Sequence, residues 1–182
     1  LVGLGMELFK TSSMIGSWSY QGDALFHAGN VPLYSGFMYA AVGSYIARSW
    51  RVLELEFTPY PKRIYTILFA LAVYVNFFSH HFAPDIRLAL FAWAALLYGR
   101  TWVTYRLHIA RHRMPLLLAF LFIAIFIWLA ENIATFSRAW LYADQLQAWH
   151  IVSLQKIGSW FLLMIISFIM IDLLHVIRKR RS

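Results

Sequence analysis

The sequence predicts an all-α membrane protein, a polytopic bundle of transmembrane helices with five full spans and the end of an earlier helix. Of its 182 residues, 61% are hydrophobic and 13% are charged, whereas soluble domains average about 45–50% apolar and about 25% charged residues. A water-soluble fold has no means of burying so much apolar surface. Long apolar stretches also recur along the chain, near the roughly 20 residues that a helix needs to cross a bilayer.

Five stretches meet this length criterion, and lipid-facing backbone must be helical because nothing in the bilayer core pairs with open amides. They are residues 32–50, 64–82, 86–105, 115–136 and 157–177. Pro32, Pro84 and Pro115 stand at or just before predicted helix starts, where the missing N–H of proline costs nothing. Residues 1–9 resemble the tail of a sixth helix. We therefore expect a hydrophobic N-terminal part to precede a single transmembrane domain over residues 1–182.

Lysine and arginine are distributed unevenly between the two ends of the predicted helices. Short loops rich in positive charge are retained on the cytoplasmic side. One side carries Arg48, Arg51, Lys62, Arg63, Arg100, Arg106, Arg111, Arg113, Arg178, Lys179, Arg180 and Arg181, and the other carries Lys10, Arg87, Arg138 and Lys156. We expect a multi-pass protein of the bacterial inner membrane with a cytoplasmic C-terminus. Because the basic residues flank apolar runs, the net charge of +8 indicates the lipid bilayer as partner, and no nucleic acid.

Polar residues gather at the opposite, outer end of the predicted bundle. An ionisable side chain inside a transmembrane helix costs about 2.5–3.5 kcal/mol, so each one needs a partner or a function. Glu131 lies roughly 24 Å from the inner end of its helix, just beneath the outer interface. The whole outer set comprises Glu7, Lys10, His27, Asn76, His80, His81, Asp85, Arg87, Glu131, Asn132 and His150. The outer loops also predict an interfacial aromatic belt of Trp18, Tyr20, Trp140, Tyr142 and Trp149.

This clustering leaves three interpretations open. In the first, Glu131 and Glu7 face His80 or His81 in an outward-opening pocket that transfers protons. In the second, His80, His81 and Glu131 bind a divalent metal, which needs three or more ligands at about 2.0–2.2 Å. Adjacent histidines diverge by about 100° on a helix, so this version needs the helix to end nearby. The third interpretation is a structural hydrogen-bonded network. The chain has no cysteine, which excludes thiolate chemistry.

Smaller patterns favour structural roles. His108 and His112 are spaced as on one helical face, but they lie among arginines, so we expect them to contact lipid headgroups. Asp172, His175 and Lys179 predict a local ion pair at a helix end. A face of small residues, Gly36, Ala40 and Ser44, predicts close helix packing. The four residues from Ile15 to Trp18 recur from Ile157 to Trp160, which we attribute to coincidence.

Several longer motifs carry a family resemblance. They are Glu7-Leu8-Phe9-Lys10, residues 16–20, residues 31–40, residues 76–82 with 85–87, and residues 128–136. Together they resemble the YoaT-like bacterial integral membrane proteins, domain-of-unknown-function family 817, over nearly the whole chain. The resemblance implies an earlier hydrophobic region but supplies no reaction. It places the family pattern on Glu7, Lys10, Trp18, Tyr20, His80, His81, Asp85, Arg87, Glu131 and Asn132.

Two functions follow as expectations. A membrane glutamate followed by a Trp-x-Tyr loop and a proline is similar to what membrane carotenoid hydratases and small lycopene cyclases show, which suggests a lipid or polyene-like ligand, such as a pigment or an isoprenoid lipid. The first function is an enzyme or binding protein, with catalytic Glu131, Glu7, His80 and His81, and with ligand-binding Lys10, Trp18, Tyr20, Asp85, Arg87 and Asn132. The alternative is an accessory or assembly subunit that packs against other membrane subunits and performs no catalysis.

Overall fold

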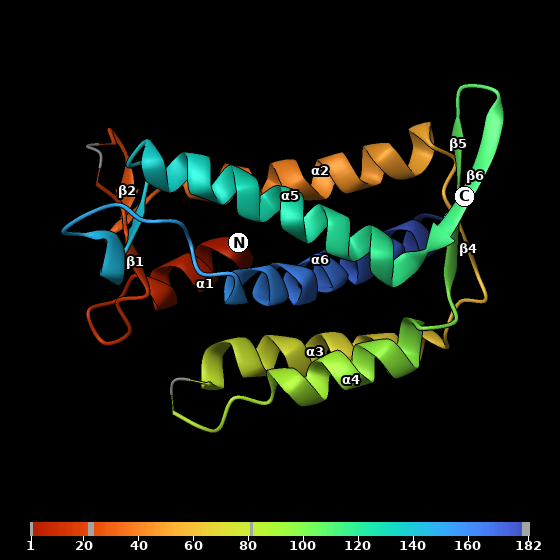
Figure 1. Cartoon of the computed structure of the whole chain (residues 1–182), viewed down its shortest axis with the longest axis horizontal. Coiled ribbons are helices and arrows are strands. Elements are labelled where there is room, and N and C mark those ends of the chain that lie inside the picture. Colours follow the sequence, from red (N-terminus) through yellow and green to blue (C-terminus); the bar gives the residue numbers. More distant parts are fainter. Residues whose placement is uncertain (1, 22–23, 81, 180–182) are drawn as a thin grey trace.

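The computed structural model describes residues 2–21, 24–80 and 82–179. Within these residues, the α-helices lie roughly along one long axis, with short strands at both ends of the molecule (Figure 1). The helices are α1 (Val2–Lys10), α2 (Tyr34–Val52), α3 (Arg63–Ser79), α4 (Arg87–Tyr98), α5 (Leu116–Phe136) and α6 (Gln155–Lys179).

The strands divide into three small antiparallel sheets. At one end, β4 (Glu56–Thr58), β5 (Trp102–Leu107) and β6 (Ala110–Pro115) form a three-stranded sheet. At the other end, β1 (Trp18–Ser19) pairs with β7 (Leu141–Tyr142), and β2 (His27–Ala28) pairs with β3 (Val31–Pro32). A 3₁₀ turn, η1 (Ala143–Gln145), follows β7. We call these ends the hairpin end, which holds β4 to β6, and the glutamate end, which holds β1 and β7.

Helix α6 is the centre of the packing, since it contacts α5, α3 and α2. Its residues Ile165 and Phe168 are buried together with Phe69 of α3 and Phe120 of α5. Gly158 lets α4 approach α6, because a Cβ there would lie 2.8 Å from the ring of Phe91.

The predicted all-α bundle with five full spans is wrong. The structure contains three sheets, and among the described residues only two helices are long and apolar enough to span a membrane, Leu116–Phe136 and Gln155–Ile177. Helix α3 and helix α4 are apolar but shorter, with 17 and 12 residues. Helix α2 covers most of residues 32–50, but its serines, glycines and arginines lower its hydropathy. The length criterion counts apolar residues without asking whether one helix contains them.

The clearest error is the predicted helix over residues 86–105. Helix α4 ends at Tyr98, about 18 Å from its start at 1.5 Å per residue. The residues that follow in β5 are mainly aromatic and β-branched, types that favour strands. They pair with β6 across a turn in which His108 has a φ of 56°. Apolar content alone does not distinguish a helical continuation from a strand.

Two smaller expectations concern the pair His108 and His112, and Asp172. His108 and His112 lie on a β-hairpin rather than on one helical face, and the His112 ring stacks 5.6 Å from that of Tyr105. Asp172 has partners outside its own helix, whereas the side chain of Lys179, with which the sequence predicts an ion pair, lies outside the part of the chain that the structure describes. Asp172 accepts hydrogen bonds from Tyr60 (3.2 Å) and Arg63 (3.3 Å), because the start of α3 packs beside α6.

Candidate functional site

Glu131 is a buried carboxylate on α5, with 3% of its surface exposed. The Tyr142 hydroxyl donates a hydrogen bond to Oε1, and the Trp160 indole N–H donates to Oε2 at 2.8 Å. Tyr142 comes from β7 and Trp160 from the first turns of α6, so three segments converge on one carboxyl group. Each carboxyl oxygen of Glu131 therefore accepts a hydrogen bond from a different side chain.

Glu7 is held in the same way on α1, with 4% of its surface exposed. The Trp18 indole donates to Oε2 at 3.0 Å, and the Tyr20 hydroxyl donates to the same oxygen at 2.8 Å. Burial first, and next the negative charge of Glu7, raise the pKa of Tyr20. The Tyr20 hydroxyl therefore keeps its proton and remains a donor. Each glutamate thus has one tryptophan and one tyrosine as its partners in these bonds.

We call Glu131 with Tyr142 and Trp160 the Glu131 unit, and Glu7 with Trp18 and Tyr20 the Glu7 unit. The two units meet at the β1–β7 pair. Trp18 lies opposite Tyr142 in the register, and their rings are 6.4 Å apart in an edge-to-face arrangement. Trp18 binds Glu7 and Tyr142 binds Glu131, so one cross-strand pair connects both carboxylates. The structure therefore brings Glu7 and Glu131 into one region, as the sequence predicts. Each glutamate has its own tryptophan and tyrosine donors.

Asn132 fixes the loop beside Glu131. Its side-chain oxygen accepts the backbone N–H of Val152 at 2.8 Å, and its amide donates to the Trp128 carbonyl at 2.8 Å. The Trp128 indole donates a bond of 3.0 Å to the Val152 carbonyl. Asn132 is thus a positioning residue for the segment that leads into α6, and no ligand contact is needed to explain it.

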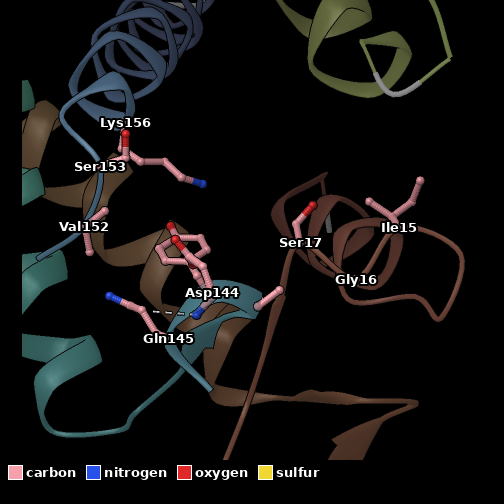
Figure 2. Close-up of a pocket in the computed structure, with 10 residues that line it drawn as sticks. Ile15, Gly16, Ser17, Asp144, Gln145, Val152, Ser153 and Lys156 are labelled. Carbon is pink, nitrogen blue, oxygen red and sulfur yellow. Dashed lines mark hydrogen bonds between the residues drawn. The ribbon is translucent and has the colours of Figure 1, made fainter. Parts of the chain in front are cut away.

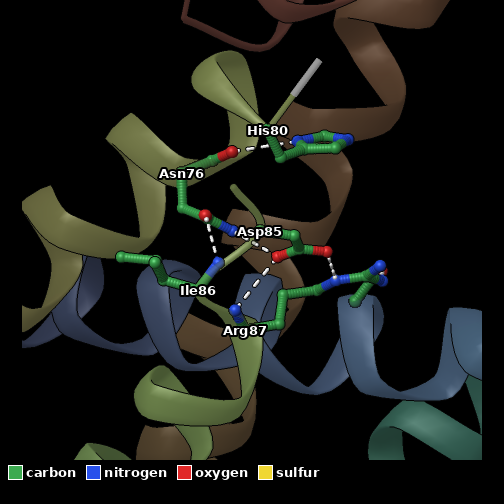
Figure 3. A network of polar contacts seen from close by, with 6 residues as sticks. Asn76, His80, Asp85, Ile86 and Arg87 are labelled. Atoms are coloured by element: carbon green, nitrogen blue, oxygen red, sulfur yellow. Dashed lines mark hydrogen bonds and ion pairs between the residues drawn. The ribbon is translucent and has the colours of Figure 1, made fainter. Parts of the chain in front are cut away.

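His80 belongs to a second network, at the end of α3 (Figure 3). Its Nδ1 lies 2.9 Å from the Asn76 carbonyl. The Asn76 side chain binds Asp85 at 3.2 Å and the Ile86 backbone N–H at 3.1 Å. Asp85 also pairs with Arg87. These bonds fasten the loop between α3 and α4.

The Asp85 carboxylate is an anion at neutral pH. Burial acts to raise its pKa, but hydrogen bonds from the Arg87 backbone and side chain and from Asn76 outweigh burial and lower it. Arg87 extends onward to the Ser159 hydroxyl at 3.3 Å. Because Ser159 precedes Trp160, which binds Glu131, the second network adjoins the Glu131 unit through α6.

Basic side chains lie near the glutamates. Lys10, at the end of α1, is buried, and its Nζ lies 4.3 Å from the centroid of the Phe77 ring. Burial, followed by the charges of Lys156 and Arg87, lowers the pKa of Lys10 to about 8. The Nζ of Lys156 lies 3.9 Å from the centroid of the Tyr142 ring. This local positive charge favours anionic groups in its vicinity.

A depression of about 370 Å³ opens beside the Glu131 unit, and Tyr142 and Lys156 belong to its lining. Figure 2 shows the segment from Ile15 to Ser17 on one side of it, facing Lys156 and the loop that carries Asp144. A second depression, of about 550 Å³, is lined by Tyr20, the tyrosine of the Glu7 unit, and by polar residues including His27. Each glutamate-bound tyrosine therefore also borders a surface depression.

Among the described residues, no group of three or more His, Asp or Glu side chains is placed to bind a metal ion. His81, a predicted metal and catalytic residue, lies outside the described residues. His80 and Glu131 belong to different networks, and the metal hypothesis stays a prediction from the sequence.

Sequence reasoning misses the partners of Glu131. It assigns Tyr142 only to an interfacial belt, and Trp160 only to the Ile-Gly-Ser-Trp repeat. That repeat is a usable signal, because its two tryptophans, Trp18 and Trp160, are the indole donors to the two glutamates. Tyr142 also follows Glu131 by 11 residues, as Trp18 follows Glu7 by 11.

Comparisons with known proteins place the chain in a family. Residues 1–168 match the family described as "Protein of unknown function (DUF817)", so the chain belongs to that family, and the resemblance inferred from the motifs is confirmed. The chain is similar to "Uncharacterized protein YoaT" of Bacillus subtilis (strain 168), with 46% identity over 180 residues. The match covers 99% of this chain and 67% of that relative. No solved structure matches the chain.

Proposed function

We propose that the chain is an integral protein of a bacterial cytoplasmic membrane that binds a lipid or polyene-like molecule at the glutamate end and exchanges protons with it. Crossing of the bilayer by α5 and α6 is supported by their length, since the 21 residues of α5, at 1.5 Å each, span about 31 Å. It is supported further by exposed apolar surface on α5, where Phe126 is 76% and Ile133 71% exposed. Such surface is unfavourable in water and suits lipid.

The orientation rests on charge. The hairpin end gathers Arg100, Arg106, Arg111 and Arg113 in and around β5 and β6, and we place this end and the end of α6 on the cytoplasmic side. The glutamate end then faces outward. A ligand in the depression beside Tyr142 has its polar group near Lys156, which belongs to the same lining.

One observation carries the acid–base part of the proposal: Tyr142 borders the depression and also donates its hydroxyl proton to buried Glu131. Proton removal needs a base within hydrogen-bond reach and a place for the proton. The Tyr142 oxygen accepts a proton from the ligand while its own proton moves to Glu131 Oε1, and the reverse step returns a proton. The ligand is left with the negative charge, and the ammonium group of Lys156, which lies 3.9 Å from the centroid of the Tyr142 ring, stabilises it.

Deuterium uptake tests this proposal even though the ligand is unidentified. The protein is reconstituted in nanodiscs with a bacterial total lipid extract and incubated in D₂O, and lipids are analysed by mass spectrometry for carbon-bound deuterium. We expect one lipid class to gain deuterium with the parent protein. Tyr142→Phe and Glu131→Gln each remove a group of the relay and are expected to lower uptake at least 100-fold, the lower range for general acid–base catalysis being about 10²-fold.

Tyr105→Phe is the matched control, because Tyr105 is a tyrosine at the hairpin end that stacks on His112. Its uptake is expected to equal that of the parent. If no lipid exceeds the uptake seen in empty nanodiscs, the acid–base function is refuted. Equal uptake by Tyr142→Phe and the parent would refute the role of Tyr142.

A second candidate function is an accessory subunit of a larger membrane complex. It is favoured by the small-residue face of α2, where Ala40 and Ser44 are exposed and a Cβ added at Gly36 meets nothing within 4 Å. Another helix fits closely on such a face. The double substitution Gly36→Leu and Ala40→Leu would then release a partner that co-purifies with the parent protein from native membranes. A parent protein that purifies alone refutes this candidate.

A further inference from the structure

The β5–β6 hairpin has two chemically different faces. Side chains alternate between the faces of a strand, and directly opposed residues share a face. One face, which we call the arginine face, holds Trp102, Thr104, Arg106, Arg111, Arg113 and Pro115. The other, which we call the apolar face, holds Val103, Tyr105, Leu107, Ala110, His112 and Met114.

The arginine face is polar and is in contact with solvent. Arg106 forms an ion pair of 2.8 Å with Glu54, and Arg111 lies 3.5 Å from Glu56. The side chains in these pairs are about half exposed, and exposed pairs of this kind contribute about 0–1 kcal/mol. Arg113 lies over the Trp102 ring, 4.7 Å from its centroid. This face therefore has a polar surface that needs no covering.

The apolar face begins in the core and continues beyond it. At its base, Val103 is buried and Met114 packs against the hydrophobic core. At its far end, Leu107 is 58% exposed, and Ile109 in the turn is 81% exposed. In Figure 1 the hairpin runs across the ends of the helices and its turn projects past α2. The exposed outer half of the apolar face therefore lies on the same side of the hairpin as its inner half, which packs against the helix ends.

We propose that the hairpin is an interfacial anchor, whose apolar face rests on the headgroup region of the same bilayer that α5 and α6 cross. Leu107 and Ile109 enter the boundary of the acyl chains, Tyr105 lies at headgroup level, and the arginine face turns to water. This inference rests on the membrane location proposed above.

Position and charge both indicate lipid as the occupant of this face. A strand pair lying across the helix ends is in the plane of the membrane surface, so its helix-facing side meets the bilayer wherever no helix lies beneath. Tyrosine prefers this depth. Although the arginine face turns to water, Arg100, Arg106, Arg111 and Arg113 together exceed Glu54 and Glu56 by two positive charges. Anionic headgroups attract such a net charge over a distance of about one Debye length.

Spin-label accessibility tests the anchor. The chain contains no cysteine, so single cysteines can be introduced without a background. Leu107→Cys and Ile109→Cys report the apolar face and the turn, and Thr104→Cys is the matched control on the arginine face. Phe126→Cys, at a 76% exposed position of α5, reports whether the protein is in the bilayer. The labelled full chain is reconstituted in liposomes of neutral and anionic phospholipid, and collision with oxygen and with an aqueous nickel chelate is measured.

We expect labels at 107, 109 and 126 to collide mainly with oxygen, which partitions into lipid, and the label at 104 mainly with the nickel chelate. If 107 and 109 behave like 104 while 126 remains in lipid, the anchor is refuted and the membrane location stands. If 107 and 109 are shielded from both reagents, protein covers the face and the anchor is refuted. If all four labels collide with the nickel chelate, both the anchor and the membrane location are refuted.

Discussion

Replacing Glu131 tests whether its carboxylate organises the glutamate end. Glu131→Ala leaves the Tyr142 hydroxyl and the Trp160 indole without their acceptor. A hydrogen bond to a charged group contributes about 1.5–3 kcal/mol, so the loss of two is expected to cost roughly 3–6 kcal/mol. Glu131→Gln keeps the shape. Its oxygen can accept from Trp160 while its amide donates to a rotated Tyr142 hydroxyl, so we expect a loss of only about 1–2 kcal/mol.

The free energy of unfolding is measured in lipid-detergent micelles by denaturant titration, with tryptophan fluorescence as the signal. A double-mutant cycle with Tyr142→Phe makes the test specific. Alone, Tyr142→Phe is expected to cost about 1.5–3 kcal/mol, whereas in the Glu131→Ala background it is expected to cost less, because the hydroxyl has already lost Glu131 as its acceptor. Additive costs would refute the Tyr142–Glu131 bond. If Glu131→Gln and Glu131→Ala lower the stability equally, the hydrogen bonds that glutamine can keep do not explain the stabilisation, and this part of the reasoning is refuted.

Three further substitutions test other parts of the structure. Asn132→Leu removes the acceptor of one backbone N–H and the donor to a carbonyl, and should lower stability by about 1–3 kcal/mol in the same titration, with Asn132→Asp intermediate. Asp85→Asn should lower the melting temperature at pH 7. Native hydrogen bonds lower the Asp85 pKa, so its contribution is fully present above the unfolded value of about 3.9 and is lost as pH falls through the lower folded-state pKa. The difference in melting temperature between the two proteins should therefore shrink as the pH falls below about 3.9. Gly158→Ala should destabilise by about 1–3 kcal/mol and be relieved by Phe91→Leu, whereas Gly5→Ala, where a Cβ meets nothing within 4 Å, should not destabilise.

Sequence patterns locate the long apolar helices well and the strands poorly. The predicted spans 115–136 and 157–177 correspond closely to α5 and α6, because Pro115 marks one start and the apolar runs are long. Residues 102–115 are misleading because apolar, aromatic and arginine residues are shared by membrane helices and amphipathic strands. Alternation along β5 and β6 becomes decisive only once the turn at His108 is known to pair them.

For the candidate site, the sequence predicts that Glu131 is buried, but it does not predict which side chains donate hydrogen bonds to it. A glutamate late in a long apolar helix must be paired, but its donors come from 11 and 29 residues away along the chain. Sequence distance fixes neither the fold of the intervening loop nor the face on which Trp160 emerges from α6. Asn132 illustrates the same limit, since its role depends on the backbone of a loop 20 residues later.

The β1–β7 ribbon has one consequence for motion. Two residue pairs form too short a ladder to persist by themselves. The ribbon therefore depends on the indole and phenol bonds to Glu7 and Glu131, and those bonds depend on the ribbon for alignment. If the loop that carries β1 or the loop that carries β7 becomes disordered, the hydrogen bonds to both carboxylates are weakened. The loops at this end of the molecule should therefore lose and regain their order together rather than independently.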